Sequence, residues 1–184
     1  RIIAELSIDN AGLLPNESFK TKYGHIQFMD IQEVMLDRLE QLLPENLYYH
    51  SVKHTIDVVT EVELIGWAEG ADDAEVLLLK LAGLFHDCGH TISYHEHEMH
   101  GTVIARDVLR EYNFEEQQID EICRLILATK MPPSPKDKLE AIMCDSDLDY
   151  LGRTDFIPVS NTLYQELKER HLIDSYDNWN KMQL

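Results

Sequence analysis

An apolar run that ends abruptly in ligating side chains constrains this fold more than any other feature. Leu81–Phe85 is followed directly by His86 and Asp87, and His90 comes four residues after the first histidine. A segment that is apolar on all sides is typical of a buried helix. Titratable groups at the end of a buried helix need partners, because an unpaired buried charge is costly. A divalent metal is one such partner, provided that other residues complete its shell.

The rest of the chain carries helical periodicity, because apolar residues recur at three- and four-residue steps. The proline-rich stretch 131–135 breaks this pattern as a loop. No alternating strand pattern is found, so the expected fold class is all-α. We expect a single-domain helical bundle over residues 26–184, preceded by an N-terminal extension (residues 1–25) with a turn signal at residues 12–16. The predicted helices span residues 26–43, 51–70, 74–85, 98–112, 115–129, 137–151 and 156–170.

Composition limits the partners of the chain. Its 184 residues, of which 44% are hydrophobic, suffice for one domain with a substantial core. The formal net charge of -18 disfavours nucleic acids and anionic membranes as partners. A small phosphorylated substrate would then need local positive charge, which a metal ion can supply. No apolar run reaches the roughly 20 residues that span a bilayer, and the first residues given do not show a signal-peptide pattern.

The three cysteines, Cys88, Cys123 and Cys144, are odd in number and lack a paired spacing. This pattern favours a reducing compartment, so we expect a cytoplasmic protein. Cys88 lies between two histidines, but a small buried apolar role explains it better than zinc ligation. The chain begins at Arg1 rather than methionine, so the sequence is compatible with a longer protein at either end. The sequence is also compatible with a homodimer.

Histidines are concentrated in one part of the chain, since seven of the nine fall between His50 and His100. His50 and His54 are four residues apart and would share one helix face, but His50 lies at the mouth of the helix if the helix begins after it. His86 and Asp87 are about 100° apart on a helix. Both can therefore reach one ion only if it lies over the edge between them, at the end of the helix.

Three carboxylates at alternate positions, Asp145, Asp147 and Asp149, offer a further donor, and only one or two of them can face inward from a helix. A single histidine on an apolar face is more often a hydrogen-bonded core residue than a ligand. Neither an HExxH zinc motif nor an EF-hand loop is present. The full set of His54, His86-Asp87 and Asp145 nevertheless favours a metal site over isolated core residues.

With these residues in place, the sequence resembles the HD-domain metal-dependent phosphohydrolases. The pattern H…HD…D is carried by His54, His86-Asp87 and Asp145. Residues 49–55 resemble the YHNxxH segment of cyclic-nucleotide phosphodiesterases and their small bacterial relatives. Residues 127–130, which prolines follow, and residues 145–152 resemble stretches of the small bacterial branch. The resemblance covers residues 26–170 and implies an all-α domain around a central site for one or two divalent metals.

The resemblance implies ligand roles for individual residues. His54, His86, Asp87 and Asp145 take the metal-ligand places, and Asp87 is a candidate bridge between two ions. Helical spacing puts Asp149 in a supporting position only, about 40° from Asp145 but one turn further on.

The resemblance also implies roles around these ligands. His50 takes the place of the general acid, and His90 that of a histidine near the bridging water. His97 falls where some branches carry a ligand for a second metal. Branches whose second metal is held entirely by protein also carry a histidine near Thr129-Lys130, and this chain has none there.

The expected reaction is hydrolysis of a phosphomonoester or phosphodiester, with a nucleotide as the expected small-molecule substrate. Water activated by a divalent metal (Mn, Fe, Mg or Zn) would be the nucleophile, because such a metal lowers the pKa of bound water towards neutrality. One metal site is predicted and a second is left open. Lys130 and Arg153 are candidates for binding phosphate oxygens, with a solvent-facing lysine as the alternative. The competing hypotheses are a di-iron oxygenase of the same fold and a regulatory domain that binds a nucleotide without turnover.

Overall fold

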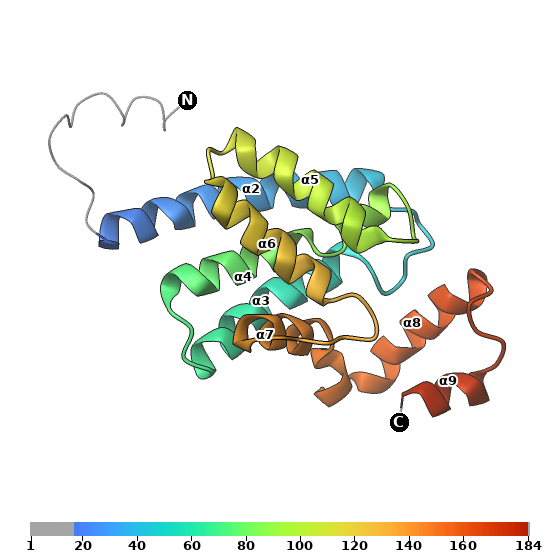
Figure 1. Cartoon of the computed structure of the whole chain (residues 1–184). Coiled ribbons are helices and arrows are strands. Elements are labelled where there is room, and N and C mark those ends of the chain that lie inside the picture. Colours follow the sequence, from blue (N-terminus) through green and yellow to red (C-terminus); the bar gives the residue numbers. More distant parts are fainter. Residues whose placement is uncertain (1–16, 184) are drawn as a thin grey trace, which may run out of the picture.

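The computed structural model describes residues 17–183, and every regular element within them is helical (Figure 1). This confirms the predicted all-α fold class. The long helices are α2 (Glu17–Leu42), α3 (Val52–Ala68), α4 (Asp73–Phe85), α5 (His97–Glu111), α6 (Glu116–Ala128), α7 (Lys138–Asp147), α8 (Phe156–Glu169) and α9 (Tyr176–Met182). Two short 3-10 helices, η1 (Cys88–Thr91) and η2 (Asp149–Gly152), follow α4 and α7.

Helix α4 is the centre of the bundle. It contacts α2, α3, α5, α6 and α7, and Figure 1 shows it between α3 and α6. Its residues Leu79, Leu81, Leu84 and Phe85 are completely buried. The last part of the helix, residues 81–85, is therefore enclosed on all sides, as its apolar sequence predicted. Burial of each leucine or phenylalanine side chain stabilises the folded state by about 1.5–3 kcal/mol. This helix therefore holds the residues that follow it in a fixed position.

Polar caps fix where the central helices begin. Asp72 forms a capping box with Glu75 at the start of α4, in which each side chain accepts from the other residue's backbone N–H. Ser51 caps α3, so His50 lies before this helix and His54 lies in its first turn. Of the two arrangements that the sequence allowed for these histidines, the structure has the one with His50 at the mouth of the helix.

Some boundaries differ from the predictions. Helix α2 begins at Glu17, before the predicted helix start at residue 26, because backbone hydrogen bonding continues a helix without an apolar stripe. Helix α7 ends at Asp147, where the predicted helix continued to Leu151. Helix α9 was not predicted, although it buries Trp179. The turn signal at residues 12–16 lies outside the described residues.

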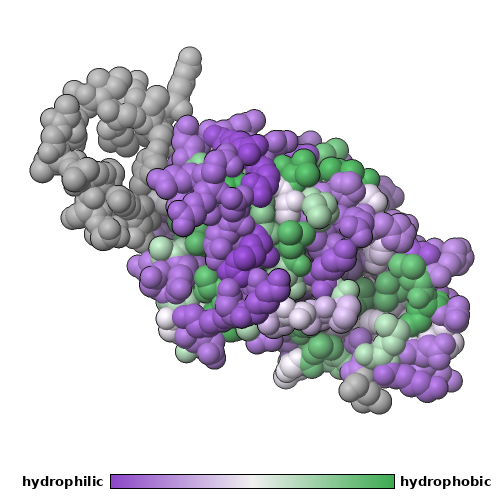
Figure 2. Space-filling view, viewed as in Figure 1, coloured by the Kyte–Doolittle hydropathy of each residue, from purple (hydrophilic) through white to green (hydrophobic). Residues whose placement is uncertain are grey.

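The surface in Figure 2 is largely hydrophilic, with smaller apolar patches between the charged side chains. This agrees with a composition in which 27% of the residues are charged. Among the helices that the structure describes, none is long and apolar enough to cross a membrane.

Gly89 connects the end of α4 to the start of α5, and we expect that it cannot be replaced by alanine without loss of stability. A Cβ atom at this position would overlap the carbonyl of His97 and lie 2.7 Å from the backbone nitrogen of Gly101. Overpacking of this kind typically costs about 1–3 kcal/mol. Chemical denaturation should therefore show a loss of at least this size for Gly89→Ala. In the matched control Gly152→Ala the new Cβ would meet nothing within 4 Å, and equal losses in the two variants would contradict this account.

Candidate metal centre

Three helix ends bring four potential ligand atoms together. His54 comes from the first turn of α3, His86 and Asp87 from the end of α4, and Asp147 from the last residue of α7. Nε2 of His54 lies 3.3 Å from Nε2 of His86 and 3.1 Å from Oδ1 of Asp147. Oδ2 of Asp87 lies 3.1 Å from Nε2 of His86 and 3.4 Å from Nε2 of His54. The donor atoms of His54, His86 and Asp147 all lie within 4.8 Å of one another.

The tautomer of His86 shows why these atoms need a cation. Its Nδ1 lies 2.8 Å from the carbonyl oxygen of Gly83, which can only accept, so Nδ1 carries a proton. In neutral His86 the other nitrogen, Nε2, is then a lone pair that faces the oxygens of Asp87 and Asp147. Acceptors that face acceptors repel one another unless a proton or a metal ion lies among them. A hydrogen bond from Nδ1–H to a backbone carbonyl is also how proteins orient metal-binding histidines.

The electrostatics of the cluster favour positive charge. Burial alone lowers the pKa of His86, but Asp87 and Asp147 outweigh burial, and the pKa is raised well above its ordinary value. Burial raises the pKa of Asp147, yet His54 and His86 together bring it below the usual range. The side chain of His54 is 9% exposed and that of Asp147 is 18% exposed, so the cluster is enclosed but reachable.

The predicted ligand Asp145 is corrected by the structure. Asp145 is exposed to solvent, and the carboxylate that joins His54 and His86 is Asp147. The two aspartates are about 200° apart on the helix, so only one can face the centre. Asp147 follows the buried residues Glu140 and Met143 by seven and four positions, which puts it on the buried face of α7. This register was the sequence signal that could have identified it.

Asp87 faces two groups of residues at once. Its Oδ2 atom points to His54 and His86, whereas its Oδ1 atom lies 3.5 Å from Nε2 of His97 and 3.9 Å from Nε2 of His90. Oδ2 is buried without a hydrogen-bond partner among the described residues. The bend from α4 into η1 allows this orientation, as expected for an adjacent His-Asp pair at a helix end.

His50 lies beside this cluster and is held by a residue that the sequence did not reveal. The carboxylate of Glu166, fully buried in α8, pairs with Nδ1 of His50 at 2.5 Å. It also accepts hydrogen bonds from the backbone N–H groups of Tyr49 and His50. Burial lowers the pKa of His50, but Asp87 and Glu166 outweigh it, and the pKa is raised above the ordinary value. The sequence signal that could have indicated this buried contact was a glutamate, Glu166, between the apolar residues Leu163 and Leu167 of α8.

His90 and His97 stack on each other, with ring centroids 3.9 Å apart. Neither ring nitrogen of His90 has a hydrogen-bond partner among the described residues. Burial lowers the pKa of His90 to about 3, so this imidazole is neutral at physiological pH. His50, Asp87 and His90 form a second group whose donor atoms lie within 4.8 Å of one another. Cys88 is buried nearby but joins neither group.

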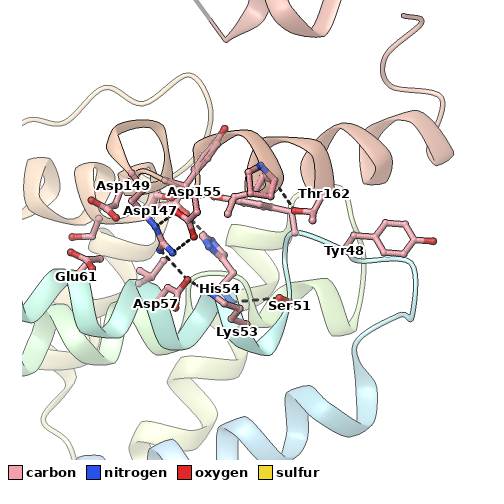
Figure 3. Close-up of a pocket in the computed structure, with 17 residues that line it drawn as sticks. Tyr48, Ser51, Lys53, His54, Asp57, Glu61, Asp147, Asp149, Asp155 and Thr162 are labelled. Atoms are coloured by element: carbon pink, nitrogen blue, oxygen red, sulfur yellow. Dashed lines mark hydrogen bonds and ion pairs between the residues drawn. The ribbon is translucent and has the colours of Figure 1, made fainter. Parts of the chain in front are cut away.

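A pocket of about 240 Å³ opens next to His54 and Asp147 (Figure 3). Tyr48, Tyr49 and Tyr150 contribute aromatic lining, and Arg153 and Lys53 contribute positive charge. Arg153 pairs with Asp57 at 3.1 Å and with Asp155 at 2.7 Å, and Lys53 also pairs with Asp57.

The structure therefore places one of the two predicted phosphate-binding residues next to the cluster. Arg153 lines the pocket beside His54 and Asp147. Lys130 lines a different hollow, is half exposed and pairs with Glu96 at 3.1 Å. The two side chains are not brought together.

The donor set fits a divalent metal. Imidazole nitrogens and carboxylate oxygens in this mixture suit ions such as Mn²⁺, Fe²⁺ and Zn²⁺. The unpartnered Oδ2 of Asp87 and the lone pair of His86 provide the binding atoms, and the first group alone offers ligands from three helices.

An all-helical domain with such a centre matches a known family. The family model of the HD domain matches residues 51–150, which is more than half of the chain. The protein therefore belongs to the HD-domain family, whose members are generally metal-dependent phosphohydrolases. No curated protein and no solved structure matches the chain.

We expect Asp147→Asn to remove most of the bound metal, because the amide keeps the shape but loses the charge that His54 and His86 face. Asp145→Asn is the matched control, since it makes the same change on the exposed side of the same helix. Metal content after purification and dialysis measures both. The assignment would be refuted if Asp145→Asn lost more metal than Asp147→Asn.

Proposed function

We propose that this protein hydrolyses a phosphomonoester or phosphodiester of a small molecule, with a nucleotide as the expected substrate. The observation that carries the proposal is the convergence of His54, His86, Asp87 and Asp147 on one point beside an open pocket. A divalent ion held there supplies positive charge to phosphate oxygens and lowers the pKa of water towards neutrality. In a chain of net charge -18, such local positive charge is what an anionic substrate requires.

His50 is the proton donor in this proposal. Its Nδ1 atom is held by Glu166, which leaves the opposite nitrogen, Nε2, as the one available for a substrate. The raised pKa keeps a larger fraction of this imidazole protonated near neutral pH, as a general acid requires. His90 is unsuited to this role because burial keeps it neutral.

The pocket in Figure 3 would receive the organic part of the substrate. Tyr48 is partly exposed at its wall and offers an apolar face with a polar end, which suits a nucleobase. Arg153 can contact a phosphate only by exchanging one of its partners, Asp57 or Asp155. The carboxylates around it, including Glu61 and Asp149, disfavour substrates with several phosphates on this side.

A phosphate-release screen tests the function. The purified protein is loaded with Mn²⁺ and incubated with nucleoside monophosphates, cyclic nucleotides and simple phosphate esters. We expect release from at least one of them, and a loss of several orders of magnitude in the Asp87→Ala variant. Absence of release from every ester by metal-loaded protein would contradict the proposal, and oxygen consumption in its place would support the oxygenase hypothesis.

A second prediction concerns the leaving group. His50→Ala should lower kcat by about 10²–10⁴ on alkyl phosphates, whose leaving alcohol needs a proton. The loss should be much smaller on p-nitrophenyl phosphate, because this leaving group departs without one. Metal content should stay near that of the wild type. Equal losses on both substrates with full metal content would exclude the acid role.

The companion variant Glu166→Gln tests the pH dependence of the same acid. Glu166 raises the pKa of His50, and an acid is active only below its pKa. The wild-type rate should fall as pH rises through this raised pKa. In Glu166→Gln the alkaline limb of kcat/KM should move to lower pH, whereas a purely structural role for Glu166 would lower the rate without moving the limb.

A further inference from the structure

Arg170, the residue directly after α8, lacks an ion pair in a strongly acidic chain. Among the side chains described for residues 24–183, no carboxylate pairs with it, although Asp and Glu outnumber Lys and Arg by 34 to 16. The two cations that the sequence predicted for phosphate binding, Arg153 and Lys130, are by contrast already paired with carboxylates. Arg170 is therefore a cation whose charge remains available for a ligand.

Two neutral groups hold the guanidinium of Arg170 in place. Its Nη2 donates to Oδ1 of Asn46 at 3.1 Å, and its Cζ lies 4.1 Å from the centre of the Tyr94 ring. Its Nε is buried and has no hydrogen-bond partner among the described residues. A buried N–H without an acceptor is costly, and the guanidinium presents its donors in a planar fork that matches an oxyanion. An anionic oxygen is thus the group that this unsatisfied donor suits best.

Arg170 lies next to the side of the metal centre that carries the proposed acid. The ring centre of Tyr94, over which Arg170 is placed, lies 5.1 Å from that of His90 and 6.2 Å from that of His50. Glu166, one turn before Arg170 in the chain, holds Nδ1 of His50. The end of α8 therefore supplies both the carboxylate that orients the acid and a cation near it.

We propose that Arg170 binds a phosphate oxygen of the ligand on the His50 side of the metal centre. The guanidinium neutralises one side of the phosphate group while the metal ion neutralises the other. Tyr94 and Asn46 hold the Arg170 side chain beforehand, so little conformational freedom is lost on binding. The choice of a phosphate rests on the proposed function, whereas the contact with the anion does not require hydrolysis.

Calorimetric titration of the Mn²⁺-loaded protein with inorganic phosphate tests the proposal. The wild type should bind phosphate, and Arg170→Met should weaken the affinity roughly tenfold or more, because a hydrogen bond to a charged group is lost. Arg170→Lys keeps the charge without the fork and should fall between the two. The matched control is Arg110→Met, since Arg110 is an exposed arginine of α5 that pairs with Glu116. This control should bind phosphate as the wild type does.

Variants of Tyr94 test how the guanidinium is held. Tyr94→Phe keeps the ring beneath Arg170 and should keep the phosphate affinity. Tyr94→Leu removes the ring and should weaken the affinity severalfold. Metal content, measured in the same samples, should be unchanged in every variant, because none of these residues belongs to either group of potential metal ligands.

Thermal unfolding separates anion binding from a purely structural contact. A lower Tm for Arg170→Met with unchanged phosphate affinity would show that Arg170 only joins Asn46 to Tyr94, and would overturn the proposal. Equal losses of affinity in Arg170→Met and Arg110→Met would also contradict it, because net charge alone would then explain them. A metal-loaded wild type that binds no phosphate would do the same. Phosphate binding that depends on Arg170, in a protein that hydrolyses no ester, would support this contact and refute the proposed hydrolysis.

Discussion

The structure depends on one energetic conflict: carboxylate oxygens and imidazole nitrogens are gathered at the completely buried end of helix α4. Helix α4 contributes the apolar burial that stabilises the bundle, and Asp87 follows it in a site that is nearly closed to water. Acceptor atoms at 3.1–3.5 Å from one another are tolerable only around positive charge. The fold is therefore arranged around a cation-binding centre.

The histidines around Asp87 differ in the group that holds the Nδ1 atom of each ring. Backbone carbonyls accept from Nδ1 of His86 and of His97, so Nε2 of each ring faces Asp87. A buried carboxylate, Glu166, instead holds Nδ1 of His50 and raises the pKa of this imidazole, which favours its protonated form. Similar imidazoles thus acquire different chemistry from their outer partners. This division is the basis for assigning binding to some histidines and proton donation to another.

The pocket beside the centre restricts what can be bound. Its one arginine, Arg153, is already paired with Asp57 and Asp155, and further carboxylates lie around it. Lys53 is likewise paired with Asp57, so in the proposed function the metal centre would supply positive charge to a phosphate while the organic part meets tyrosine and acidic side chains. For the proposed hydrolysis, a substrate with a single phosphate group and an uncharged organic part would fit these surroundings best.

The sequence by itself determined the helices, the central position of 81–85 and the participation of His54, His86 and Asp87, because apolar periodicity and local spacing carry this information. It could not choose between Asp145 and Asp147, since the register of α7 is set by packing against α3, α4 and α6. Glu166 was beyond its reach for the same reason. Its role arises from contact with His50, 116 positions away. Only the tertiary structure decides such contacts, because packing rather than local preference determines which side chains are buried together.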